Sequence, residues 1–368
     1  MDTQSDNTDF KALFAELLSN TDISSDASLE EISEKWNALN DLLFKNIPQK
    51  LFRFRSCSVD SFISLQSGTI SLCTANSFKD KYDSLVYVNN DEIIKRITAL
   101  INSNVMEEIW NGIENGTVIS VFESIYGKEK IRQMLEEIYK YPVEERKQKF
   151  YESAYFVLPQ IINQIKPQID YIRRDRFTKI ACFTEDVQSL YMWDTYADGY
   201  KGYALEYDFR EFHFKGCRSC NKVHDCNDAN KNFSNLFPII YSNIRYDAIV
   251  NVMNIILGSI FRSWGANKLL PPAIDQLFWY KAYLYKNGIE YGHEKEWRMI
   301  TRCLNQQDND FATISDLECL KAIYYGPNME KRYKDFLREI ARQKNLLEYD
   351  ISIDTESSCY ELRITPLK

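Results

Sequence analysis

Strand-forming segments lie scattered along this chain and never alternate regularly with helical ones. Runs with period two, or short continuous apolar runs, occupy residues 50–56, 69–74, 178–186 and 201–209 and recur through the last third of the chain. Residues 91–176 carry helical periodicity instead. A parallel α/β fold needs strands that alternate with helices. The sequence therefore predicts an α+β fold whose core is a mixed or antiparallel sheet.

These patterns divide the chain into three parts. They are an N-terminal helical extension (residues 1–48), a core domain in two segments (residues 49–90 and 177–368) and a helical insertion (residues 91–176). Within the extension, Ser28 precedes Glu31 by three residues, which is the spacing of a helix-capping box. In the first core segment we expect a helix at residues 59–66, a Ser-Gly turn and then a strand.

The later core segment adds two expected helices, at residues 245–264 and 328–344. The strands expected there lie at residues 236–242, 294–303, 320–327, 349–354 and 360–367. The aromatic stretch MWDTYADGYKGY contains an expected turn at Asp198 and Gly199, and its rings are expected to fill core space. The apolar helix at 245–264 could fill the core or form the seam of a homo-oligomer.

Composition narrows the class of protein. The net charge of −8 and the pI of about 5.2 exclude a protein that is basic overall and give no strong signal for nucleic acid. The start is acidic and polar, unlike an export signal. The most apolar stretch, residues 248–261, contains two asparagines and is shorter than the ~20 residues of a membrane span. We predict a cytoplasmic protein without a membrane partner, whose nine cysteines are mostly reduced.

The segment IEYGHEKEWRMI sets two acids and an arginine at alternate positions. In a β-strand, Glu294, Glu296 and Arg298 share one face, because successive side chains point to opposite sides. Such a face is either the floor of a site or a solvated surface with a cross-strand ion pair. Arg53 and Arg55 of LFRFRS also share a face, either as an exposed strand edge or as a clamp for phosphate.

A second cluster of candidate ligands lies in GCRSCNKVHDCND. Its four members are Cys217, Cys220, His224 and Cys226. Thiolate and imidazole ligands suit tetrahedral zinc, and a closed four-ligand site of this kind is structural. The alternative interpretation is a loop with free thiols.

Several blocks of the sequence, taken in order, resemble a widespread bacterial family known as domain of unknown function 2971. The blocks are LFRFRS with TISLCTANSFKDKYDS, then IACFTED and LYMWDTYADGYKGYALEYD, and then HEKEWRM and LKAIYYGP. The resemblance covers residues 50–90 and 178–368. The order of motifs is also similar, more distantly, to that of ADP-ribosyltransferases, although the Ser-Thr-Ser motif and the His-Tyr pair of its two branches are absent.

The second resemblance implies NAD as the substrate and a role for each matching residue. The matching residues are, in order, Arg53 or Arg55, Phe183 with Thr184, and Glu296 or Glu294. The resemblance implies that the arginines bind phosphate and that Glu296, the second acid of the E-x-E pattern, acts on the ribose. Breaking the bond between nicotinamide and ribose develops positive charge on the sugar, which a carboxylate stabilises. Near the middle motif, four aromatic residues could wall a pocket for the rings, namely Phe183, Tyr191, Trp193 and Tyr196. Arg298 completes the polar strand face.

We therefore predict an NAD-consuming enzyme of the ADP-ribosyltransferase type, such as a bacterial toxin or an anti-phage effector. One alternative is a sensor that binds a nucleotide-type small molecule without turnover. Another is a metal-dependent nuclease, in which Asp80, Asp83, Glu294 and Glu296 hold a divalent ion. The sequence leaves the acceptor open among water, protein, nucleic acid and a small molecule.

Overall fold

A computed structural model of the chain describes most of the core domain and parts of both helical regions. The described residues are 3–19, 28–101, 104–117, 119–120, 123, 127–153, 175–210, 236–249, 281–302, 310–315 and 319–367. The candidate zinc ligands Cys217, Cys220, His224 and Cys226 lie outside them, and so does most of the helix predicted at 245–264. Across the described residues, no helix is both long and apolar enough to cross a bilayer.

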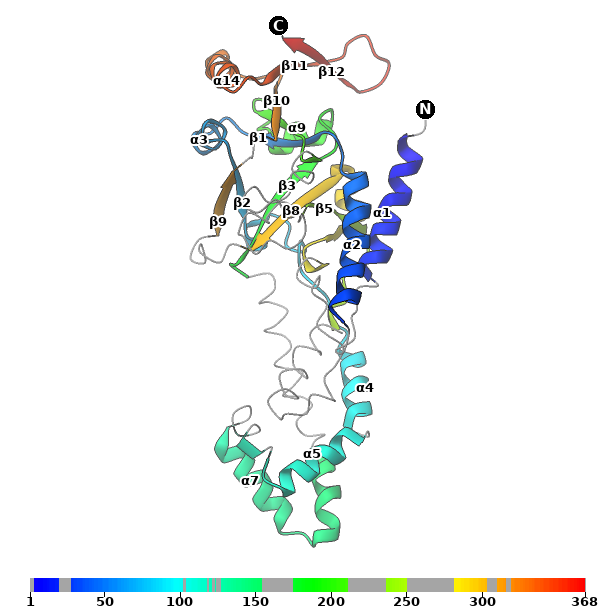
Figure 1. Cartoon of the computed structure of the whole chain (residues 1–368). Helices are drawn as coiled ribbons and strands as arrows, with labels where there is room; N and C mark the ends of the chain where they lie inside the picture. Colours follow the sequence, from blue (N-terminus) through cyan, green and yellow to red (C-terminus); the bar gives the residue numbers. More distant parts are fainter. Residues whose placement is uncertain are drawn as a thin grey trace.

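A mixed sheet of ten strands forms the core and confirms the predicted α+β fold (Figure 1). Its strands are β1 (Leu51–Arg55), β2 (Thr69–Cys73), β3 (Thr178–Thr184), β4 (Tyr203–Tyr207), β5 (Leu236–Pro238), β8 (Glu296–Arg302), β9 (Phe311–Ser315), β10 (Leu320–Tyr325), β11 (Leu347–Ile353) and β12 (Leu362–Leu367). Neighbouring strands are antiparallel except β10 and β11.

Strand β3 is the branch point of the sheet. One edge of β3 pairs with β8 along its whole length, and β5 continues beyond β8. The other edge pairs with β1 at Thr184 and with β2 at Ile180. From β1 the sheet runs through β4, β10 and β11 to β12, and from β2 it ends at β9. The three strands that carry the sequence motifs, β1, β3 and β8, are therefore neighbours.

Helices surround this sheet and also form a separate lobe. They are α1 (Thr3–Ser19), α2 (Leu29–Asn46), α3 (Val59–Ser67), α4 (Asn90–Ile101), α5 (Asn104–Glu114), α7 (Lys128–Tyr139), α9 (Leu190–Tyr196), α13 (Gly288–Tyr291) and α14 (Lys331–Gln343), with short 3-10 helices η1 (Ala75–Ser77) and η4 (Gly292–Glu294). Figure 1 shows α4, α5 and α7 at the end of the molecule opposite β11 and β12. Helix α1 packs on the sheet instead, where Phe10 stacks on Trp297 with ring centroids 6.0 Å apart.

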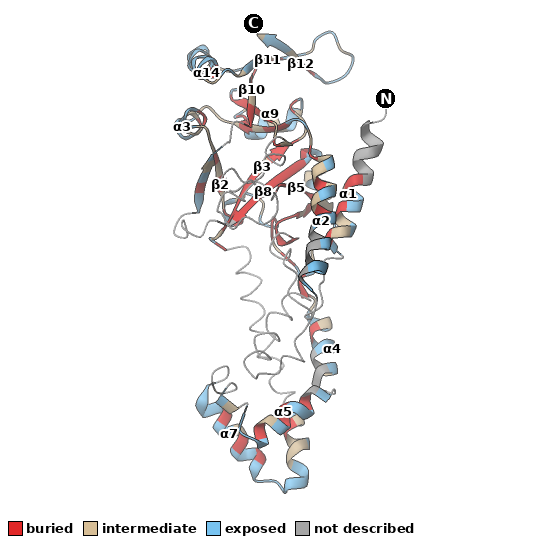
Figure 2. Cartoon of the chain, viewed as in Figure 1, coloured by how far each residue is buried: buried red, intermediate tan, exposed pale blue. Residues whose placement is uncertain are grey.

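Several local predictions are confirmed. Ser28 and Glu31 form the expected capping box at the start of α2. Helix α3 ends at a left-handed Gly68, with φ of 62°, and this turn leads into β2. Asp198 and Gly199 also have positive φ, as the predicted turn requires. The buried residues concentrate in the strands at the centre of the sheet (Figure 2).

The strand predicted at residues 236–242 is instead two strands in two sheets. After β5 the chain leaves β8, and β6 (Ile240–Ser242) pairs in parallel with β7 (Tyr285–Asn287). The change of partner occurs at consecutive amides, because the N–H of Ile239 donates to Glu296 O and that of Ile240 donates to Leu284 O. The continuous run LFPIIYS gives no sign of such a change, because no turn residue separates the two strands.

Candidate functional site

The segment that carries Glu294, Glu296 and Arg298 begins in a tight turn and then continues as strand β8. Glu296 and Arg298 project from the same face of β8, as predicted, and Arg298 Nε donates to Glu296 Oε1 at 2.7 Å. The prediction of a strand is wrong for Glu294, which ends η4, because the next residue, Lys295, is left-handed with φ of 46°. This turn nevertheless brings the two acids together, and both bind the ammonium group of Lys286.

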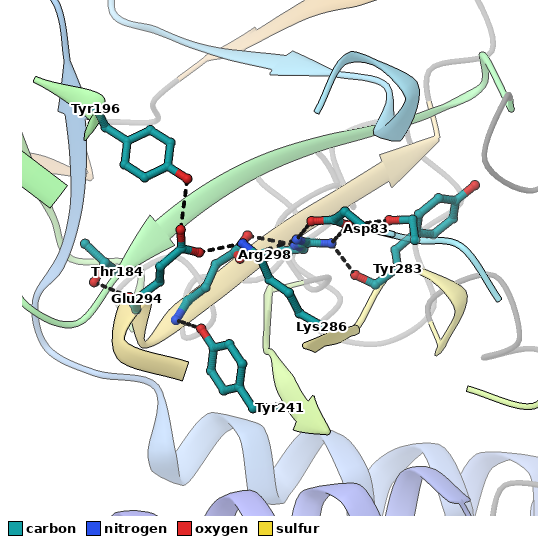
Figure 3. Close-up of polar contacts among 10 residues, drawn as sticks. Asp83, Thr184, Tyr196, Tyr241, Tyr283, Lys286, Glu294 and Arg298 are labelled. Carbon is teal, nitrogen blue, oxygen red and sulfur yellow. Dashed lines mark hydrogen bonds and ion pairs between the residues drawn. The ribbon is translucent and has the colours of Figure 1, made fainter. Parts of the chain in front are cut away.

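Five buried charged side chains form one continuous cluster, which we call the charge cluster. Its members are Asp83, Lys286, Glu294, Glu296 and Arg298. Figure 3 labels all of them except Glu296. Lys286 Nζ lies 2.5 Å from Glu294 Oε2 and 2.9 Å from Glu296 Oε2. The Arg298 guanidinium binds both oxygens of Asp83, at 2.8 and 2.5 Å. No side chain in the cluster is more than 7% exposed.

Neutral groups from three further elements fix the cluster. The Thr184 hydroxyl, at the end of β3, donates to the backbone oxygen of Glu294 at 2.6 Å. The Glu296 N–H donates to the Tyr241 hydroxyl at 2.8 Å, and Arg298 donates to the Tyr283 backbone oxygen at 2.8 Å. Long side chains held from several sides lose little further freedom when a ligand binds, so this is a preorganised arrangement.

Glu296 and Lys286 remain charged despite their burial. Burial opposes ionisation of Glu296, but Arg298 and Lys286 outweigh it and lower the pKa of the Glu296 carboxyl from 4.5 to about 2. Burial would lower the pKa of Lys286, yet the neighbouring carboxylates raise it. Counted by formal charge, the three carboxylates and two cations of the cluster leave one excess negative charge. A site with this excess favours positive charge in whatever lies next to it.

Partly exposed aromatic rings lie beside Glu294 and Lys286. Glu294 Oε1 accepts a hydrogen bond from the hydroxyl of Tyr196 at 2.9 Å, and Tyr196 itself is 40% exposed. Tyr191 is 38% exposed and lies edge-on to His293, with ring centroids 4.2 Å apart. The ring of Tyr291 lies 4.5 Å from Lys286 Nζ. These rings link the buried cluster to the surface at Glu294.

The arginines of the first motif lie on the opposite face of the sheet. Thr184 is registered with both Phe52 and Glu296, so these three side chains share a face. Arg53 follows Phe52 and points the other way, where its guanidinium lies 5.9 Å from the centre of the Phe183 ring. Arg55 has the same orientation as Arg53 because it is two residues further along β1. The structure does not bring either arginine to Glu296.

Two of the predicted ring-binding residues are core residues. Phe183 is 2% exposed and packs against Tyr207 and Phe209. Trp193 is fully buried, and its Nε1–H donates to the Val187 backbone oxygen at 2.7 Å. Of the predicted set, the structure therefore gathers Thr184, Tyr191 and Arg298 around the two glutamates, together with Tyr196.

Sequence reasoning missed Lys286 and the pairing of Asp83. Lys286 lies on β7, and no periodicity marks it as the partner of two acids. Asp83 lies 215 residues before Arg298 in a polar loop, where it was one of two candidate metal ligands. A buried arginine needs a carboxylate partner, and that need is the one signal that could have suggested the pair. Asp80, the other candidate, accepts a hydrogen bond from the Tyr82 N–H at 2.8 Å.

A scan against family models, a search of curated proteins and a search of solved structures each found no match to this chain. Within the described part of the chain, no three His, Cys, Asp or Glu residues are placed to hold one metal ion.

Proposed function

We propose that the chain binds an NAD-type dinucleotide and cleaves its bond between nicotinamide and ribose, with Glu294 as the carboxylate beside the ribose. The observation that carries this proposal is the excess negative charge of the cluster, next to the exposed rings of Tyr191 and Tyr196. The nicotinamide ring of NAD is cationic, and the sugar gains positive charge as the bond breaks. Fixed negative charge in a buried site stabilises both.

Glu294 suits the contact with substrate better than Glu296 does. Both oxygens of Glu296 accept hydrogen bonds from the cations Arg298 and Lys286. Among the described residues, one oxygen of Glu294 is bound only by the neutral Tyr196 hydroxyl, which a ribose hydroxyl can replace when a ligand enters. We assign Glu294 to the ribose and Glu296 to positioning of Lys286 and Arg298. This assignment reverses the role that the E-x-E resemblance implies for the two acids.

The proposed step balances with water as the acceptor. The bond between ribose C1′ and the nicotinamide nitrogen breaks, and its electron pair stays on the nicotinamide ring, which becomes neutral. A water oxygen then forms a bond to C1′ and releases one proton to the solvent. The rings of Tyr191 and His293 offer an edge and a face against which the departing nicotinamide can pack.

Binding without turnover is a second candidate, and one observation favours it. Every carboxylate oxygen of Glu294 and Glu296 already has a hydrogen-bond donor, so the cluster is satisfied without a ligand. Buried ion clusters of this kind also occur where their role is to specify one conformation. On this reading the same surface binds a nucleotide and the rate of bond cleavage is zero.

Release of free nicotinamide from NAD by the purified protein tests the proposal. Glu294→Gln keeps the shape of the side chain and removes its charge, so we expect a rate at least about 100-fold lower. Glu290→Gln is the matched control, because Glu290 is an exposed acid on α13 four residues away. A rate that is equal in wild type and Glu294→Gln, or no release above the uncatalysed rate by wild type, would overturn the proposal. NAD binding without release would favour the second candidate.

A further inference from the structure

A pocket of about 230 Å³ lies beside Lys286 and has no role in the mechanism above. Its lining includes Tyr82, Arg245, Tyr246, Tyr285 and Lys286. Lys286 belongs both to this lining and to the charge cluster, where its ammonium group binds Glu294 and Glu296. The pocket and the proposed site are therefore adjacent through one residue.

Arg245 gives the pocket an anion-binding group. Its guanidinium carbon lies 5.9 Å from the centre of the Tyr82 ring and 5.4 Å from that of Tyr87, so the two rings hold it. Arg245 is exposed, and among the described residues no carboxylate forms an ion pair with it. A guanidinium that lies beside two aromatic rings and is not paired with an acid offers a fork of N–H donors that fits phosphate oxygens.

Two tyrosine rings of the lining suit contact with a planar base. Tyr246 and Tyr285 stack with centroids 5.2 Å apart and an angle of 27° between their planes. Binding sites for whole drug-sized ligands enclose roughly 300–1,000 Å³. The smaller volume here fits one base with its sugar phosphate better than it fits a dinucleotide. Aromatic walls and one cation together describe a site for a nucleoside monophosphate.

The charge cluster anchors both walls of the pocket. Arg298 binds Asp83, which follows Tyr82 in the chain, and also donates to the backbone oxygen of Tyr283, two residues before Tyr285. A backbone hydrogen bond from the Tyr87 N–H to Tyr246 O, of 2.8 Å, joins the first wall to the segment that carries Arg245. The pocket is thus held open by buried contacts, not by the ligand.

We infer that this pocket binds the adenosine monophosphate half of the dinucleotide, with the phosphate on Arg245 and the base against the tyrosine rings. The inference rests on the proposed function, because it assigns the second half of the same substrate. It places the reacting half of the ligand at Glu294 and the recognition half on the far side of Lys286. The two halves can be tested separately, since adenosine monophosphate has no nicotinamide to release.

Titration calorimetry of the full chain with adenosine monophosphate, adenosine and inorganic phosphate tests the inference. We expect the monophosphate to bind at least about tenfold more tightly than either fragment, because it alone uses both the rings and Arg245. Arg245→Ala should weaken the monophosphate at least about tenfold, and Arg245→Lys should weaken it less. Arg332→Ala is the matched control, since Arg332 is exposed and stacks on Tyr333 on α14. Thermal unfolding of each variant reports whether it is folded.

The inference is overturned if the monophosphate does not bind, if Arg245→Ala binds it as tightly as wild type does, or if phosphate alone binds equally well. The proposed function fails while the pocket is retained if the monophosphate binds in a manner that depends on Arg245 but wild type releases no nicotinamide from NAD. Release that depends on Glu294, without binding that depends on Arg245, would instead retain the proposed function and reject the pocket.

Discussion

The two faces of strands β1, β3 and β8 accommodate arginine in different ways. On one face, Arg298 is fully buried and binds two carboxylates, and these partners raise its pKa although burial opposes this. On the other face, Arg53 lies over the ring of Phe183, and its hydrogen bond to the Ser71 hydroxyl is 3.4 Å long. Burial and the nearby Arg55 lower the pKa of Arg53 to about 10. The same residue type is an anchor on the first face and a poorly compensated charge on the second.

This difference teaches that motif order along the chain does not decide which motif residues meet. Successive side chains of a strand point to opposite faces. Thr184 and its neighbour Phe183 therefore lie on different faces, and so do Phe52 and Arg53. The face that carries Thr184 and Glu296 gathers charges. Aromatic side chains pack on the opposite face, where Phe10 of α1 stacks on Trp297 of β8.

The largest contrast between the faces is expected in stability. Arg298→Met leaves Asp83 and Glu296 buried without their main cation, which should cost about 3–5 kcal/mol of unfolding free energy. Arg53→Met should change the unfolding free energy by less than about 1 kcal/mol, because among the described residues Arg53 has only a long hydrogen bond and a ring contact to lose. Urea unfolding of the two variants measures both values. Similar losses in the two variants would contradict the contrast.

Lowering the pH should reduce the unfolding free energy mainly through the face that carries Glu296. The pKa of Glu296 falls from 4.5 in the unfolded chain to about 2 in the folded protein. A lowered pKa contributes stability that is complete above about pH 4.5 and is lost as pH falls toward about 2, here about 3 kcal/mol in total. The stability difference between wild type and Glu296→Gln should therefore shrink between pH 5 and 3. A difference that stays constant over that range would show that Glu296 is not ionised through these contacts.

The smallest effect is expected at the edge of the charged face. Tyr196→Phe removes one neutral donor from Glu294, and we expect a loss of about 1 kcal/mol. Burial and the nearby Glu294 raise the pKa of Tyr196, so its hydroxyl remains a donor at neutral pH. Thermal unfolding measures the loss. The phenylalanine variant should keep most of its nicotinamide release, since the proposal has a ribose hydroxyl take the place of that donor, and a complete loss of release would argue against the exchange.

Local sequence signals predicted much of the fold. The capping box at Ser28, the glycine end of α3 at Gly68 and the strand at β8 each depend on residues within a few positions of one another. The strand β9 was not predicted, because its exposed Phe311 breaks the expected pattern and its stability comes from pairing with β2. Strand β7 was also not predicted, because its three residues are too few to show a period-two pattern.

The candidate site was predicted only in part. Alternation along β8 correctly put Glu296 and Arg298 on one face, because that rule is local. The position of Glu294 depends on a left-handed Lys295, and lysine is not a residue that signals such a turn. Lys286 and Asp83 reach the site from β7 and from a distant loop, and contacts of that range leave no trace in a single sequence.

Nicotinamide release by Glu294→Gln and by Arg53→Gln, measured side by side with wild type, tests the central claim most directly. The two residues come from motifs of the same resemblance, yet the structure puts only Glu294 in the charge cluster. The account predicts that release falls at least about 100-fold in Glu294→Gln and stays within a few-fold of wild type in Arg53→Gln. Release that is lost in Arg53→Gln and retained in Glu294→Gln would contradict it and would place the reaction on the opposite face of the sheet.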